Sequence, residues 1–162
     1  MYKLRNYTVL DAQKINDLAV LAFDQFKTFY DNWQTFSEKL ASFSELSHTA
    51  EIIVAEDLNG EILGAVAYVP EETIKAEYFP KNTPIIRMLV VNPTVRGLGI
   101  GKALSLECIC RAKRDNCQNI ALHTSSIMSI ALPMYLRMNF KEYGKAPVIY
   151  SVKYNVYLKS ID

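Results

Sequence analysis

The chain has 162 residues, of which half are apolar and 22% are charged, with a formal net charge of +1. A chain of this length and apolar content can bury one hydrophobic core, so we expect a single domain over residues 1–162 and exclude disorder. The near-neutral charge argues against a nucleic-acid or membrane surface. No apolar stretch reaches the roughly 20 residues that span a bilayer.

The N-terminal residues and the cysteines indicate in which cellular compartment the protein is expected. Residues Met1–Asn6 lack the apolar core of a signal peptide. Cys108, Cys110 and Cys117 are odd in number and contain no C-x-x-C pair, so the sequence predicts neither a disulfide framework nor a zinc site. We therefore expect a cytoplasmic protein with reduced thiols and no bound metal.

The periodicity of apolar residues predicts alternating helices and strands. Residues 2–9 alternate weakly, as in a strand. Asp11 precedes a one-faced helical pattern from Ile15 to Tyr30, and a second helix runs from Trp33 to Phe43. The further predicted elements are strands over 51–56 and 62–69 joined by a hairpin turn at Asn59-Gly60, a strand over 85–91, a helix with Leu104, Cys108 and Ala112 on one face, a strand over 119–123, a helix over 127–138, and strands over 140–149 and 150–158.

The most informative segment follows the strand over 85–91. Asn92-Pro93 ends the apolar run, glycines occupy positions 97, 99 and 101, and a helix-forming stretch begins at once. Glycines let the backbone approach a ligand, and the first N–H groups of a helix have no partner inside it. Together with the helix dipole, this order predicts a site for a phosphate or pyrophosphate.

Two familiar phosphate-binding loops do not fit this segment. A dinucleotide loop, G-x-G-x-x-G, would need glycine where Lys102 stands. A nucleotide triphosphatase loop would need glycine at Arg96 and a hydroxyl residue at Ala103. The pattern that remains is Arg96-x-x-Gly99-x-Gly101, and a plain tight turn is the alternative interpretation.

Arg96-x-x-Gly99-x-Gly101 resembles the acyl-CoA pyrophosphate loop of the GCN5-related N-acetyltransferase (GNAT) superfamily. A second part of the resemblance lies at residues 131–140, which are similar to the family's helix ending in Ala-x-x-x-Tyr-x-x-x-Gly-Phe, with Tyr135 at the tyrosine position. The motifs cover residues 85–140, whereas the first half of the chain agrees only in the order of its elements.

The tyrosine segment departs from the family pattern at three positions. Asn139 stands where the family has glycine, at a position that closes a helix in the left-handed conformation, which Asn tolerates. Pro133 should kink the helix or leave it short. Met128 replaces an asparagine that often contacts CoA, which puts that contact in doubt.

The resemblance implies a fold, a reaction and a cofactor site. It implies one α/β domain with a mixed, mostly antiparallel central sheet flanked by helices, in the order β-α-α-β-β-β-α-β-α-β-β. It also implies transfer of an acetyl group from acetyl-CoA to a primary amine of a small molecule or peptide, by direct attack without a covalent enzyme intermediate. The residues that it assigns to acetyl-CoA are Leu89, Val90, Val91, Arg96, Gly97, Leu98, Gly99, Ile100, Gly101 and Lys102.

The resemblance also assigns the proton transfers. Tyr135 would protonate the departing thiolate, although a tyrosine in an apolar helix is often a core residue. A lysine-like amine costs about 4.6 kcal/mol to deprotonate at pH 7, against about 1.4 kcal/mol for an α-amino group, so a base is needed. Many relatives carry a glutamate where Arg87 stands. Another branch has its base twelve residues before the tyrosine, which is His123; a structural histidine is the alternative.

The sequence indicates less clearly which residues bind the amine that accepts the acetyl group. We expect Arg87 to share one strand face with residues 89 and 91 and to bind a substrate carboxylate, or else to pair with an acid such as Glu56. Segments 24–48 and 70–83 are candidates for the walls of the acceptor pocket, or for core packing. Two other functions stay open: a CoA-binding sensor of the same fold and a nucleotide-binding module. The tyrosine-rich final strand is a candidate homodimer edge, or ordinary sheet.

Overall fold

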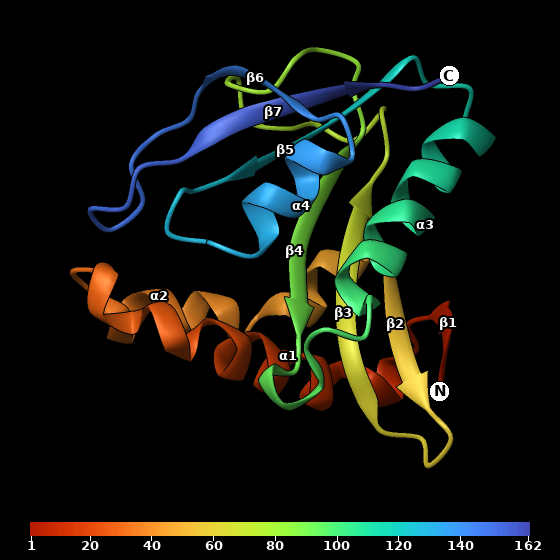
Figure 1. The fold of residues 1–162 in the computed structure, drawn as a ribbon, viewed down its shortest axis with the longest axis vertical. Coiled ribbons are helices and arrows are strands. Elements are labelled where there is room, and N and C mark those ends of the chain that lie inside the picture. The colour runs from red at the N-terminus through yellow and green to blue at the C-terminus, as the bar shows by residue number, and fades with distance from the viewer.

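The computed structural model describes residues 1–162 and contains a seven-stranded sheet with the strand order β1-β2-β3-β4-β5-β7-β6 (Figure 1). The expected α/β order is confirmed. The strands and α-helices in chain order are β1 (Tyr2–Asn6), α1 (Ala12–Phe23), α2 (Trp33–Leu40), β2 (Glu51–Asp57), β3 (Ile62–Val69), β4 (Ile85–Val91), α3 (Ile100–Arg114), β5 (Asn119–Thr124), α4 (Ala131–Arg137), β6 (Lys141–Lys145) and β7 (Asn155–Ser160).

The sheet is mixed and mostly antiparallel, as expected. Strands β1 to β4 pair antiparallel, and so do β5, β7 and β6. The two halves meet at the parallel pair β4–β5, whose register contains only Ile85 opposite Ala121. In Figure 1, β2–β4 run vertically while β5–β7 cross the top of the view. The sheet therefore opens between β4 and β5.

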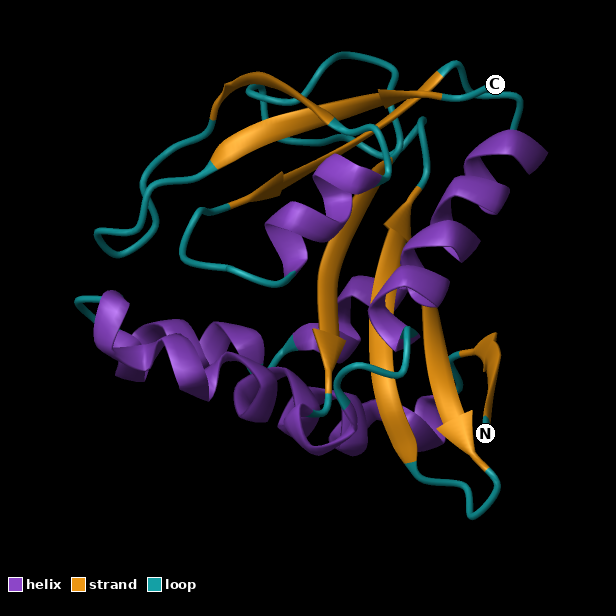
Figure 2. Cartoon of the chain, viewed as in Figure 1, coloured by secondary structure: helices purple, strands orange, loops and turns teal.

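Helices cover both faces of this opened sheet. Figure 2 shows α1 and α2 across the bottom of the view and α3 running along β2 and β3. One core cluster lies against α1 and α2 and contains Val54 and Val90, and the other lies under α3 and contains Val66 and Leu104. A Cβ at Gly64 would approach Ile100, Leu104 and the Val90 carbonyl to within 3.1 Å, so this glycine allows α3 to pack closely on the sheet. None of the helices combines the length and apolar character that crossing a membrane requires.

Several predicted elements have different bounds in the structure, among them the helix predicted over 127–138, which forms only over Ala131–Arg137. The first helix does not continue to Tyr30 as an α-helix, because α1 ends at Phe23 and a 3₁₀ segment, Asp24–Phe29, follows it. The strands predicted over 140–149 and 150–158 are shorter, at Lys141–Lys145 and Asn155–Ser160. Between them Tyr150 and Ser151 have positive φ values of 43° and 73°, so the chain turns there instead of extending.

The final strand is not an edge of the sheet. β7 pairs with β5 on one side and with β6 on the other, so the ordinary-sheet interpretation of this segment holds. Its backbone groups are already used within the chain and are not available to a second copy.

Candidate active site

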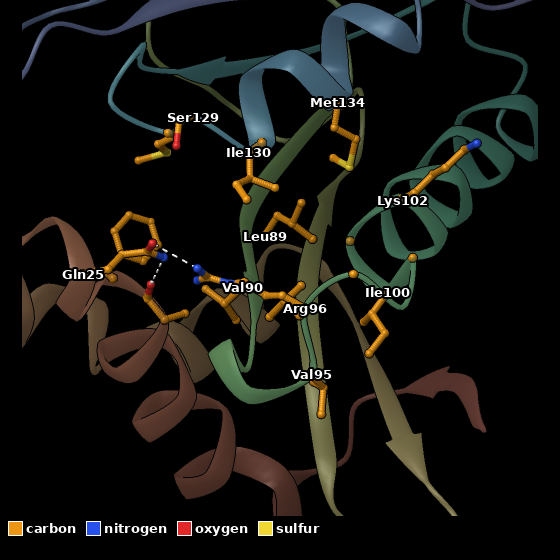
Figure 3. Close-up of a pocket in the computed structure, with 18 of the residues that line it drawn as sticks. Gln25, Leu89, Val90, Val95, Arg96, Ile100, Lys102, Ser129, Ile130 and Met134 are labelled. Atoms are coloured by element: carbon orange, nitrogen blue, oxygen red, sulfur yellow. Dashed lines mark hydrogen bonds between the residues drawn. The ribbon is translucent and has the colours of Figure 1, made fainter.

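Two cavities meet where the sheet opens between β4 and β5. The loop cavity, of about 360 Å³, is lined by the glycine loop, the end of α1 and the start of α4 (Figure 3). The aromatic cavity, of about 320 Å³, is lined by residues of α2, β4, β5 and the segment before β7. The lining residues common to both cavities are Phe23, Leu89, Met128 and Ala131.

The glycine loop has the geometry of an anion site. Gly97 and Gly99 have φ values of 85° and 78°, in the left-handed region that favours glycine, and Gly99 caps α3. The first backbone hydrogen bond of α3 is donated by Ala103, to the Gly99 carbonyl at 2.9 Å. The N–H groups of Ile100, Gly101 and Lys102 therefore have no acceptor within the helix.

Gly101 leaves space at the start of α3. A Cβ built there would lie 3.6 Å from Val91 Cγ2, 3.8 Å from Leu89 Cδ2 and 3.8 Å from Met134 Sδ. These are ordinary contact distances, so any larger side chain would fill the space between β4 and α4. The start of α3 thus stays close to the open end of β4.

Nine of the ten residues assigned to acetyl-CoA by the sequence line the loop cavity. The exception is Leu98, whose side chain is exposed. Arg96 Nη1 donates a hydrogen bond of 2.9 Å to Gln25 Oε1, which links the loop to the segment after α1 (Figure 3). The exposed Lys102 side chain extends away along α3, leaving its backbone N–H at the cavity.

A bulge in β4 changes the faces of the strand. The β3–β4 register shifts between Ala65 and Ala67, and Met88 has a φ of 57°. Leu89 and Val91 pack against the α3 cluster, and so does Ile86, whereas Met88 packs on the opposite cluster. The expectation that Arg87 shares a face with residues 89 and 91 is therefore wrong, because the bulge adds a residue and reverses the alternation.

Arg87 nevertheless lines the aromatic cavity, together with His123. The alternative partner Glu56 is bound instead by Arg5, whose Nε lies 3.1 Å from Glu56 Oε2. Arg87 itself makes no hydrogen bond or ion pair with another residue of the chain. Its guanidinium is left available to a ligand.

His123 is enclosed by aromatic rings. The rings of Tyr78, Phe79 and Tyr154 lie 5.9, 5.5 and 5.2 Å from its imidazole, and the Tyr78 ring is stacked on it. Its Nδ1 is buried without a hydrogen-bond partner. Burial first, and then the charge of Arg87, lower the pKa of His123 to about 4, so the imidazole is neutral at pH 7.

Tyr135 is buried on α4, one helical turn after Ala131, which lines both cavities. It lines the aromatic cavity, and its ring meets Phe140 edge to face with centroids 5.5 Å apart. Burial raises the pKa of the phenol, an effect that the Ser105 hydroxyl partly opposes. Tyr135 is therefore protonated at neutral pH.

The helix that carries Tyr135 confirms two expectations. It extends only from Ala131 to Arg137, with Pro133 in its first turn, where the missing N–H is tolerated. Asn139 has a φ of 70°, in the left-handed conformation expected at the position of the family's glycine. This turn brings the Phe140 N–H to the Tyr135 carbonyl at 3.1 Å.

Sequence reasoning missed part of the aromatic cavity. Segment 24–48 does line it, through Phe36, Lys39 and Leu40, but Tyr150 and Tyr154 come from a stretch predicted to be strand. Residues of segment 70–83 contact His123 through Tyr78 and Phe79 without lining the cavity. The only available signal was the density of tyrosines near the C-terminus. No three His, Cys, Asp or Glu side chains lie together as metal coordination requires.

With this geometry established, the chain can be compared with known proteins. Residues 15–140 match the sequence model of the acetyltransferase (GNAT) family. The chain therefore belongs to this family of acetyltransferases. N-acetyltransferase 8B of Mus musculus is 32% identical over 98 residues, which span 60% of this chain and 40% of that relative.

Solved structures show the same fold at low sequence identity. A GNAT-family acetyltransferase of Staphylococcus aureus Mu50 superposes with a TM-score of 0.76 at 16% identity, with both chains fully covered. A protein of Corynebacterium glutamicum, described as histone acetyltransferase HPA2 and related acetyltransferase, gives 0.77 at 24% identity, covering 99% and 97% of the two chains. The yncA protein of Salmonella typhimurium, solved with its cofactor acetyl-CoA, gives 0.71 at 15% identity, covering 99% and 94%.

Proposed function

We propose that this protein transfers an acetyl group from acetyl-CoA to a primary amine of a small molecule or peptide, by direct attack of the amine. The observation that carries the proposal is the meeting of the two cavities beside Tyr135. One cavity has the features of a pyrophosphate site, and the other contains His123 and Arg87. A donor and an acceptor bound in them would meet at the lining that they share.

The loop cavity fits acetyl-CoA. The unpaired N–H groups of residues 100–102 face an anion at the positive end of the α3 dipole, and Arg137 adds a positive charge to the lining. Past Ile85 the edge of β4 toward β5 has no strand partner, so the backbone of Leu89–Val91 is free to bind the pantetheine arm. A backbone N–H there would polarise the acyl carbonyl. The Salmonella structure with acetyl-CoA shares this fold.

Tyr135 and His123 would move the protons. Acetyl-CoA supplies the acetyl thioester, and the amine takes the acetyl group as the C–S bond breaks. Tyr135, kept protonated by burial, gives its phenol proton to the departing sulfur. His123 is neutral and receives the proton that the amine nitrogen loses, through Nε2, because its Nδ1 is enclosed. Solvent then restores both side chains.

The low pKa of His123 limits what it can do. Taking a proton from a lysine-like ammonium of pKa about 10.4 would cost about 9 kcal/mol with a base of pKa about 4. We therefore assign His123 to the proton released once the neutral amine has bonded to carbon. The first deprotonation is left to solvent, which is less costly for an amine of lower pKa.

The test is CoA release from acetyl-CoA with a panel of amino acids, aminosugars, aminoglycosides, polyamines and peptides. Wild type, Tyr135→Phe and the exposed control Tyr143→Phe are compared. We expect turnover with one class, a fall of about 10²-fold or more in kcat for Tyr135→Phe, unchanged acetyl-CoA affinity, and no effect of Tyr143→Phe. Acetyl-CoA binding without turnover of any amine would instead identify a CoA-binding sensor.

A further inference from the structure

The charges that line the aromatic cavity are all of one sign. Its seventeen lining residues include the cations Lys39 and Arg87 and the neutral His123, but no aspartate or glutamate. A cationic acceptor would have to lie among these charges without a counter-ion. An anionic group on the acceptor would be attracted to them instead.

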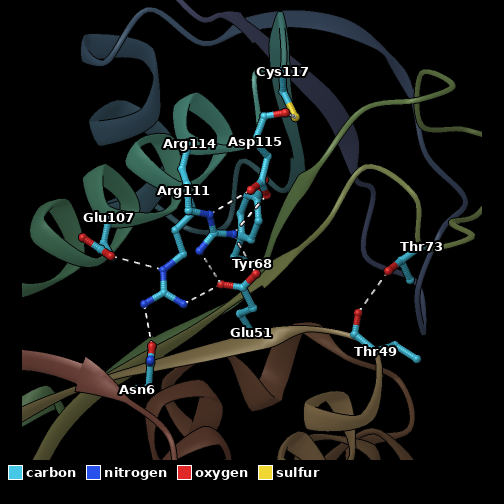
Figure 4. Close-up of polar contacts among 10 residues, drawn as sticks. All are labelled: Asn6, Thr49, Glu51, Tyr68, Thr73, Glu107, Arg111, Arg114, Asp115 and Cys117. Atoms are coloured by element: carbon cyan, nitrogen blue, oxygen red, sulfur yellow. Dashed lines mark hydrogen bonds and ion pairs between the residues drawn. The ribbon is translucent and has the colours of Figure 1, made fainter.

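Four of the six arginines have side-chain partners within the chain. Arg5 binds Asp11 and Glu56, and Arg96 binds Gln25. Figure 4 shows a group that we call the α3 polar cluster, in which Arg111 and Arg114 bind carboxylates; its members are Glu51, Tyr68, Arg111, Arg114 and Asp115.

Only Arg87 and Arg137, of the six arginines, have no side-chain partner, and each lines one of the two cavities. Lys39 also lacks a carboxylate and lies with its Nζ 5.2 Å from the centre of the Tyr150 ring. Two cations without partners thus lie along the wall of the aromatic cavity. Guanidinium binds a carboxylate through two parallel hydrogen bonds, which makes Arg87 the stronger anchor.

The rest of the cavity wall is apolar except for Thr124. Phe36 stacks on Tyr30 with centroids 4.3 Å apart and contacts the Tyr150 ring. The hydroxyl groups of Tyr30 and Tyr154 are hydrogen-bonded to each other, so one of their two O–H donors is already satisfied within the chain. A volume of about 320 Å³ is at the small end of the range for small-molecule sites. The body of the acceptor should therefore be compact and apolar.

We propose that the acceptor is a small apolar primary amine that carries a carboxylate, as an apolar amino acid does. Arg87 and Lys39 bind the carboxylate, the rings of Phe36, Tyr150 and Tyr154 surround the apolar part, and the amine faces the junction at Tyr135. This inference rests on the proposed acetyl transfer and specifies its substrate class. It excludes polyamines and aminoglycosides as preferred acceptors.

The test compares acceptors that differ only in the anionic group. L-Phenylalanine, L-phenylalaninamide and 2-phenylethylamine are assayed with acetyl-CoA, as are leucine and leucinamide, with spermidine as a cationic reference. Rates are corrected for the neutral fraction of each amine. We expect the amino acids to exceed their amides in kcat/KM by about 10-fold or more, as one charged hydrogen-bonded contact provides.

Variants locate the origin of this selectivity. Arg87→Gln should lower kcat/KM for the amino acids by about 10- to 100-fold more than for their amides, so that the selectivity ratio falls toward one. Lys39→Gln should act in the same direction with a smaller effect, because an ammonium binds a carboxylate as a point charge and not through two parallel hydrogen bonds. Lys145→Gln, an exposed cation outside both cavities, should keep the wild-type ratio.

The outcomes separate the two proposals. Equal or faster turnover of the amides or of spermidine would overturn the carboxylate assignment and leave acetyl transfer intact. Turnover of a dipeptide such as Phe-Leu but not of free amino acids would overturn the small-molecule assignment. Acetyl-CoA binding without turnover of any amine would overturn both. An Arg87→Gln variant that slows all acceptors equally would show that Arg87 does not read the carboxylate.

Discussion

The α3 polar cluster and the aromatic cavity both take ionisable side chains from the central strands, yet they treat them differently. In the cluster Glu51 accepts hydrogen bonds of 2.8 Å from both Arg111 and Arg114, and Tyr68 donates one of 2.9 Å to Asp115. In the cavity Arg87 has no partner, and His123 Nδ1 is buried without one. Polar groups that pair within the chain stabilise the fold, whereas the exposed Arg87 guanidinium in the cavity stays available to a ligand. The comparison separates ionisable groups that pair within the chain from those that are left for the proposed site.

The largest expected effect is that of replacing His123 in the aromatic cavity. His123→Phe keeps a ring among Tyr78, Phe79 and Tyr154 but removes the proton acceptor, so kcat should fall by about 10²- to 10⁴-fold. The assay is steady-state CoA release with the best acceptor. Asp115→Asn, in the α3 polar cluster, should leave kcat unchanged. A His123→Phe variant with wild-type kcat would show that the histidine is structural.

Acid should affect the two regions in different pH ranges. The pKa of His123 is about 4 in the folded chain and about 6.5 when unfolded, so the unfolded state binds more protons between these values. The contribution of the neutral, buried His123 to the free energy of unfolding is complete above pH 6.5. As the pH falls toward 4, that free energy decreases by up to about 3 kcal/mol. The pKa of Glu51 lies below its usual 4.5, through its hydrogen bonds with Arg114 and Arg111, so its contribution is lost only below about pH 4.5.

Urea unfolding between pH 7.5 and 4.5 would separate these contributions. The free energy of unfolding of wild type should decrease over this range, and that of His123→Phe should decrease less. Replacing the exposed His48 by asparagine should keep the wild-type slope. Parallel slopes for wild type and His123→Phe would contradict the effect of burial on this imidazole.

The smallest effect is expected from a substitution in the α3 polar cluster. Glu51→Gln removes the charge that Arg111 and Arg114 share, and because Glu51 is partly exposed the loss in unfolding free energy should be about 1 kcal/mol. Denaturant unfolding at pH 7 measures it, and kcat should not change. A marked loss of activity in a folded Glu51→Gln variant would mean that the cluster also supports the site.

Features that depend on neighbouring residues were predictable. The glycine loop was expected to form an anion site at the start of a helix, and Gly97 and Gly99 do take the left-handed conformation. Asn139 closes its helix as expected, and Pro133 accompanies a short helix. In each case the relevant backbone conformation is set by residues a few positions apart.

Features that depend on distant contacts were not predictable. The end of α1 at Phe23 and the turn at Tyr150 and Ser151 interrupt patterns that look continuous in the sequence. The Asp31 N–H donates to the Tyr150 carbonyl at 3.0 Å, a contact across more than a hundred residues. The faces of β4 were misassigned because a bulge, which periodicity does not reveal, lies at Met88.

The sequence by itself therefore determined the order of the elements, the glycine loop at the start of a helix and the position of Tyr135, because these depend on local periodicity and backbone preference. Only the tertiary structure decided that the sheet opens after Ile85, that Arg87 and Lys39 line one cavity, and that aromatic rings from two distant segments enclose His123. The physical reason is that burial and electrostatic environment are properties of the packed chain. The pKa of His123 and the freedom of Arg87 follow from neighbours that lie far away in the sequence.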